Sequence, residues 1–167
     1  MKRNLVTNHT SYSYIVYLKV VGGEITSAAA LAPKIGSFGI PPKKVGEDIQ
    51  KATMEWRGVK IQIELMVQNR NVFVSVIPTT APLIIKALKE GPRDRKKVKN
   101  VKHNGNVKFD DIIEIAKKMR AKSFAVDFAG TVKEVLGTCV SLGCTVDTKN
   151  PKDVQKAIDA GEQVIDV

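Results

Sequence analysis

The feature that most constrains the fold is a strict alternation of side chains along residues 59–67. Five apolar residues share one side of this segment: Val59, Ile61, Ile63, Leu65 and Val67. Because successive side chains of a strand point to opposite faces, this pattern predicts a half-buried β-strand. Residues 68–71 are typical of a turn, and residues 72–77 return as a second strand, which predicts a hairpin. Residues 14–21, rich in β-branched and aromatic types, supply a third strand.

A segment rich in proline and glycine, residues 33–42, lies between the first strand and the hairpin. Because proline fixes φ and glycine tolerates unusual φ, we expect a stiff loop of defined shape there. Proline is favourable in the first helical turn, so a helix is predicted from Pro41 or Pro42 to about Thr53. Helical spacing gives that helix a core-facing side of three residues: Val45, Ile49 and Ala52.

The second half of the chain has helical periodicity. A linker is predicted at residues 78–82, followed by a helix over residues 83–89. An amphipathic helix follows, with its apolar residues at helical spacing: Ile112, Ile115, Ala116 and Met119. A long helix is predicted from about Asp127 to Leu142, ended by Gly143. A short helix over residues 151–160 is expected in a loosely packed tail.

These elements predict an α+β chain with three parts. Residues 1–78 form a small α/β domain with a three-stranded sheet and a proline-rich helix entry. Residues 79–147 form a three-helix domain, and residues 148–167 form a C-terminal tail.

The charge favours a polyanionic partner. Lysine and arginine number 27 against 17 acidic residues, a formal net charge of +10. Nucleic acid is the first candidate for a basic chain of this size, although charge alone leaves a basic enzyme as an alternative. Six basic residues gather in one short run: Arg93, Arg95, Lys96, Lys97, Lys99 and Lys102. We interpret the run as neutralising phosphates; the alternatives are a solvated charge run and a localisation signal.

The long helix over residues 127–142 carries small and polar residues opposite its apolar stripe. Gly130, Gly137 and Ser141 share that face, flanked by Thr131 and Thr138. A glycine inside a helix costs about 1 kcal/mol relative to alanine, so two of them require a reason. One reading is close approach of the helix backbone to the shallow minor groove of A-form RNA. The alternative is packing of another helix against the small residues.

The aromatic content of this half argues against recognition of single-stranded RNA. It has three phenylalanines, Phe109, Phe124 and Phe128, and therefore no stacking platform. We expect recognition of the shape of folded RNA instead.

Catalytic, metal-binding and targeting signals are absent from the sequence. It has no P-loop, no GxGxxG and no nucleophile motif, so we expect neither an enzyme nor a cofactor. Cys139 and Cys144 have no metal-ligand spacing, and we expect two reduced, partly buried thiols. No run approaches the roughly 18 apolar residues of a membrane helix. The polar residues 1–13 do not resemble a secretory signal, and an organellar address is a minor alternative.

Seven segments in order resemble one known family. They are residues 22–24, 30–36, 41–49, 68–70, 83–90, 92–97 and 136–138. The chain resembles the stalk-base proteins of the large ribosomal subunit, the L-eleven family, over roughly residues 14–147. The Pro-Pro-Lys-Lys-Val form of residues 41–45 is similar to the eukaryotic cytosolic branch. Residues 1–13 do not match the usual start of the family.

The resemblance implies a function and a set of partners. The C-terminal domain would bind the GTPase-associated region of large-subunit ribosomal RNA, with Gly137, Thr138 and Ser141 at a minor groove and the basic run ordering on RNA. The N-terminal domain would face the acidic stalk protein and the translational GTPases (elongation factors) through Pro33, Gly36, Pro41 and Pro42. The implied location is the cytosolic ribosome, with no membrane contact.

Overall fold

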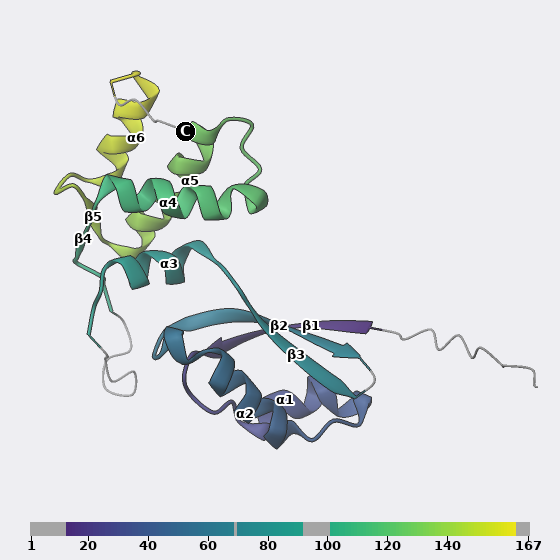
Figure 1. Ribbon diagram of the computed structural model, residues 1–167. Helices are drawn as coiled ribbons and strands as arrows, with labels where there is room; N and C mark the ends of the chain where they lie inside the picture. The colour runs from purple at the N-terminus through teal and green to yellow at the C-terminus, as the bar shows by residue number, and fades with distance from the viewer. Residues whose placement is uncertain (1–12, 69, 92–100, 163–167) are drawn as a thin grey trace, which may run out of the picture.

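The computed structural model of the chain describes residues 13–68, 70–91 and 101–162 (Figure 1). Their buried apolar side chains form two separate clusters. One cluster runs from Leu18 to Val67 and the other from Ile84 to Val154. Each half of the chain therefore has its own hydrophobic core, one under a sheet and one among helices.

The first half is built on an antiparallel sheet of three strands. They are β1 (Ser13–Val21), β2 (Lys60–Gln68) and β3 (Asn71–Ile77), in the order β1-β2-β3. The register places Ile63 of β2 between Leu18 of β1 and Val76 of β3. Four of the five residues of the predicted apolar side of β2 are buried: Ile61, Ile63, Leu65 and Val67. The predicted hairpin and the third strand are confirmed.

Two helices cover the inner face of this sheet, below it in Figure 1. They are α1 (Ala28–Ile35) and α2 (Pro42–Ala52), separated by the 3₁₀ turn η1 (Gly36–Phe38). The expected loop at residues 33–42 is wrong at its start, because Pro33 lies inside α1. Burial of Leu31 and Ile35, one helical turn apart, favours a helix there despite the hydrogen bond that proline cannot make.

The start of α2 at Pro42 is confirmed, whereas its core face needs a correction. Val45 and Ile49 are buried as predicted, but Ala52 is exposed and Thr53 is buried in its place. The Thr53 hydroxyl donates to the Ile49 carbonyl at 2.7 Å and accepts the Gly23 amide at 3.1 Å. A polar side chain is tolerated in the core because both of its hydrogen-bonding roles are satisfied. The turn η2 (Met54–Trp56) then leads to β2.

The second half consists of helices. α3 (Thr80–Ala87), α4 (Phe109–Met119) and α5 (Phe128–Leu142) are the three predicted helices, and η3 (Arg120–Lys122) extends α4. The short strands β4 (Asn106–Val107) and β5 (Thr145–Val146) pair in parallel. α3 begins three residues before the predicted start, inside the expected linker. α5 ends at Gly143 with a left-handed φ of 89°, as predicted.

The last described helix, α6 (Pro151–Asp159), packs against α5. Val154 is buried in the same core cluster as α3, α4 and α5. The Gln155 amide donates to the Lys133 carbonyl at 2.8 Å, and the Lys133 ammonium lies 2.6 Å from the Asp159 carboxylate. The expectation of a loosely packed tail is therefore wrong for residues 151–159.

Candidate nucleic-acid interface

α5 separates a buried face from an exposed one. Val132, Val135, Leu136 and Cys139 are fully enclosed, as the helical periodicity predicts. On the opposite side Gly137 and Ser141 are exposed, and Thr138 is half-buried. The C-terminal turns of α5 thus present the small and polar surface that the sequence indicates.

Within the described residues, no contact requires glycine at position 137. A Cβ built on Gly137 would find one neighbouring atom within 4 Å, Nε2 of Gln155 at 3.8 Å, an ordinary van der Waals distance. Alanine would therefore fit, and it would favour the helix by about 1 kcal/mol. The glycine keeps the exposed backbone of α5 bare, which allows a partner to approach the helix closely.

The two hydroxyl groups beside Gly137 are turned back onto the helix. Thr138 donates to the Glu134 carbonyl at 3.2 Å, and Ser141 donates to the Thr138 carbonyl at 2.7 Å. Each hydroxyl oxygen keeps lone pairs that can accept a hydrogen bond. The surface therefore offers acceptors to donor groups such as the 2′-hydroxyls that line an RNA minor groove.

Gly130 and Thr131 do not belong to this exposed surface. Thr131 is fully buried, and its hydroxyl accepts from Arg120 at 3.0 Å and donates to Ser123 at 3.0 Å. A Cβ on Gly130 would stand 2.7 Å from the Ala125 Cβ. The expectation that Thr131 lies at the surface facing a partner is therefore corrected, because its side chain is buried. Glycine at position 130 is explained by the close packing of Ala125 against it.

These internal contacts come from a loop that the helical periodicity of the sequence does not predict. Residues 123–127 fold over the first turn of α5, and Arg120 donates to the carbonyls of Ala125 and Val126. Helical periodicity alone places Gly130 on the polar face of the helix. The periodicity of one helix contains no information about another segment that packs across that face. The glycine itself is the only sequence signal for the close packing.

Most of the basic run lies outside the described residues, namely Arg93, Arg95, Lys96, Lys97 and Lys99. Its last member, Lys102, is exposed and lies beside the C-terminal end of α5. A Cβ on Gly143 would be 3.8 Å from the Lys102 Cβ, and the next amide, of His103, donates to the Leu142 carbonyl at 3.0 Å. The described end of the basic run therefore lies beside the C-terminal end of α5, which carries Ser141.

The proline-rich segment of the first half is on the surface. Pro33, Gly36 and Pro41 are exposed, and Pro42 is half-buried at the start of α2. Nothing lies within 4 Å of a Cβ built on Gly36. A cavity of about 420 Å³ opens beside Pro41, between α2 and the start of β3.

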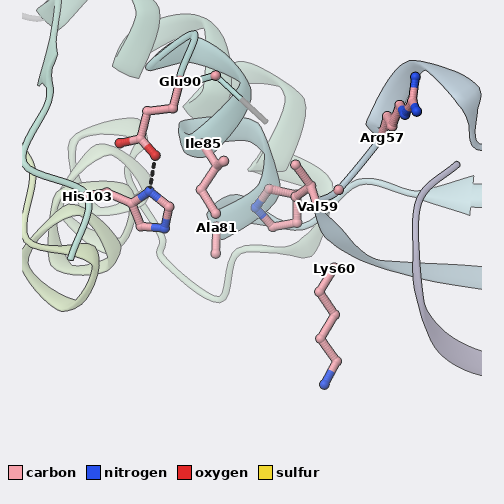
Figure 2. A pocket seen from close by; sticks show the side chains of 10 residues that line it. Arg57, Val59, Lys60, Ala81, Ile85, Glu90 and His103 are labelled. Carbon is pink, nitrogen blue, oxygen red and sulfur yellow. Dashed lines mark hydrogen bonds and ion pairs between the residues drawn. The ribbon is translucent and has the colours of Figure 1, made fainter. Parts of the chain in front are cut away.

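A second cavity, of about 440 Å³, lies between α3 and the segment over residues 57–60 that leads into β2 (Figure 2). Ala81 and Ile85 of α3 line its centre, and Glu90 and His103 meet at one end. The buried His103 ring places Nδ1 2.5 Å from a carboxylate oxygen of Glu90. This pair fixes the chain just after α3 to the chain just before β4, which gives His103 a structural role.

The structure adds no sign of metal chemistry in the part it describes. Within residues 13–68, 70–91 and 101–162, no three His, Cys, Asp or Glu side chains are placed to hold a metal ion. Cys139 and Cys144 are free and buried, and burial raises the pKa of both thiols. None of the helices among these residues is long and apolar enough to cross a membrane.

Known proteins match both halves of the chain. The model of the N-terminal domain of ribosomal protein L11 matches residues 16–72, and the model of the RNA-binding domain of ribosomal protein L11 matches residues 76–146. The large ribosomal subunit protein uL11x of Arabidopsis thaliana is 61% identical over 148 residues, which cover 88% of this chain and 89% of the relative. The large ribosomal subunit protein uL11 of Neurospora crassa is 58% identical over 148 residues, covering 89% and 90% respectively. With both domain models in order along most of its length, the chain belongs to the ribosomal protein L11 family.

Proposed function

We propose that this chain is a structural constituent of the large ribosomal subunit and that its helical half binds ribosomal RNA through α5. The observation that carries the proposal is the exposed backbone at Gly137, flanked by Thr138 and Ser141. No packing among the residues that the structure describes accounts for that glycine. The match of residues 76–146 to an RNA-binding domain and the names of the relatives support the same assignment.

The RNA site that we propose is the GTPase-associated region at the base of the stalk. Folded RNA of that kind offers a minor groove with 2′-hydroxyl donors, which suits the acceptor oxygens of Thr138 and Ser141. Phosphates on either side of the groove would meet Lys102 and the rest of the basic run. The net charge of +10 supports a polyanionic partner for the whole chain.

The N-terminal domain, in this proposal, faces the acidic stalk protein and the translational GTPases. Pro33, Gly36 and Pro41 are exposed on α1, η1 and the entry to α2. Prolines and a short 3₁₀ turn hold this surface in one shape, so a partner binds it with little loss of backbone entropy. Cytosolic ribosomes are the proposed location, because the relatives are eukaryotic proteins of the large subunit.

Sucrose-gradient sedimentation of a cell lysate tests the assignment. The tagged full-length chain should migrate with large ribosomal subunits after a wash in moderate salt. In purified form it should bind a transcript of the GTPase-associated region in the presence of excess transfer RNA. A chain that binds this transcript but stays at the top of the gradient would be an RNA-binding regulator outside the ribosome. A chain that does neither would contradict the proposal.

A further inference from the structure

The loop between η3 and α5 exposes two large apolar side chains. Phe124 is 100% exposed and Val126 is 89% exposed, the highest values among the exposed large hydrophobic residues that the structure describes. Ala125, between them, turns inward onto Gly130. Two uncovered apolar side chains two residues apart give this loop an exposed apolar surface that a partner could cover.

Several hydrogen bonds hold this loop in place. The Arg120 guanidinium donates to the carbonyl of Ala125 at 2.8 Å and to that of Val126 at 2.7 Å. The Ala125 amide donates to the Ser123 hydroxyl at 3.1 Å, and the Thr131 hydroxyl donates to the same oxygen at 3.0 Å. The exposure of Phe124 is therefore a property of an ordered loop, fixed before any partner binds.

The loop extends the surface on which Gly137 lies. Ala125 covers Gly130, and positions seven apart in an α-helix differ by only about 20° around the axis and lie about 10 Å apart along it. A partner that contacts the bare backbone at Gly137 can therefore also reach the loop.

The charge around the loop suits RNA. Residues 117–127 contain four basic side chains, Lys117, Lys118, Arg120 and Lys122, and a single acidic one, Asp127. All four basic residues are exposed. An aromatic ring near exposed lysines such as Lys117 and Lys118 can stack on a nucleobase while these lysines meet the neighbouring phosphates.

We propose that Phe124, with Val126 beside it, stacks on an unpaired base of the RNA that α5 contacts. This inference rests on the proposed function and adds to it a specific contact, to a base that the folded RNA exposes. It also revises the expectation that this half of the chain lacks a stacking group, since one aromatic ring on an ordered loop is sufficient for one base.

The test measures binding of full-length variants to a transcript of the GTPase-associated region. Phe124→Ala should lower the affinity about tenfold, within the range for loss of one stacked base. Its melting temperature should not change, because the Phe124 side chain is fully exposed. Phe124→Trp should keep or raise the affinity, whereas Phe124→Leu should behave like Phe124→Ala. Phe73→Ala, at a half-exposed phenylalanine on the outer face of β3, is the matched control and should bind like wild type.

The possible results distinguish an error in the stacking proposal from an error in the proposed function. If wild type binds the transcript and Phe124→Ala binds equally well, stacking of Phe124 on a base is refuted. If Phe124→Leu binds like wild type, the contact is apolar without stacking, and the proposal is likewise overturned. If wild type itself fails to bind, the proposed function is at fault.

Discussion

The side chain of Ala125 occupies the space that a side chain on Gly130 would need. A Cβ on Gly130 would lie 2.7 Å from the Cβ of Ala125. Two turns further along α5, the nearest side chain to a Cβ on Gly137 among the described residues is that of Gln155, at 3.8 Å. The two glycines of one helix face therefore serve different purposes. Gly130 allows a loop of the same chain to pack closely, whereas Gly137 leaves helix backbone exposed on the surface, where we propose that RNA binds.

Replacing Gly130 with alanine should destabilise the fold. Overpacking against Ala125 costs about 1–3 kcal/mol, and the better helix propensity of alanine offsets about 1 kcal/mol of that. Thermal unfolding should show a lower melting temperature than that of Gly137→Ala, the matched variant in open space. A Gly130→Ala protein as stable as Gly137→Ala would show that the loop can move away at no cost.

Replacing Arg120 with alanine should loosen the loop over residues 123–127. The variant loses the hydrogen bonds from the guanidinium to the Ala125 and Val126 carbonyls, and it leaves the buried Thr131 hydroxyl without one partner. A destabilisation of about 1 kcal/mol is expected for an exposed site. Hydrogen–deuterium exchange of the loop amides should be faster, and Arg120→Lys should not restore protection, because lysine lacks the forked donor geometry. Unchanged exchange would contradict the assigned role of Arg120.

Replacing both Lys96 and Lys97 with alanine should weaken RNA binding and reduce its dependence on salt. Each phosphate contact contributes roughly 0.7 to 0.9 to the slope of log K against log salt, so the loss of two contacts should reduce the slope by about 1.5. Binding measured from low to moderate salt checks this prediction. Lys43→Ala with Lys44→Ala, an exposed pair at the start of α2, is the control for net charge. An equal loss of slope in the control pair would mean that the run acts only through overall charge.

The buried thiols predict a loss of stability at alkaline pH. Burial raises the pKa of Cys139 above the ordinary value of 9.0, so the folded chain keeps this proton where the unfolded chain has lost it. The folded state then binds more protons, and the free energy of unfolding must fall as the pH rises above about 9. Denaturant unfolding of wild type and Cys139→Ala between pH 7 and pH 10 should show a smaller decline in the variant. Parallel curves would exclude a contribution from this thiol.

The sequence predicts those helices and strands in which the spacing of apolar residues shows directly which side is buried. Alternation places β2 with its buried residues Ile63 and Leu65, and helical spacing places α4 and α5. Pro33 shows where local rules fail, because the burial of Leu31 and Ile35 outweighs the poor helix propensity of proline. The packing of α6 likewise depends on contacts with α5 that no local pattern contains.

The exposed surface of the candidate interface was predictable only in part, for a related reason. A helical projection assigns Thr131 and Thr138 to similar positions beside the polar face. Thr131 is nevertheless buried and Thr138 is not, because the loop held by Arg120 covers only the first turn of α5. The exposure of a residue on a helix face depends on whether another segment folds across that face. Helical periodicity contains no information about such segments.

Replacing Gly137 with leucine tests the central claim most directly, provided that the melting temperature and the affinity for the GTPase-associated transcript are measured on the same protein. Leucine is the better helix former by up to about 1 kcal/mol, so the free protein should melt at the same temperature or higher. Its bulk should obstruct the approach of RNA to the backbone of α5, and the affinity should fall. A variant that melts much earlier yet binds RNA normally while folded would contradict the account, because Gly137 would then serve internal packing and not the partner.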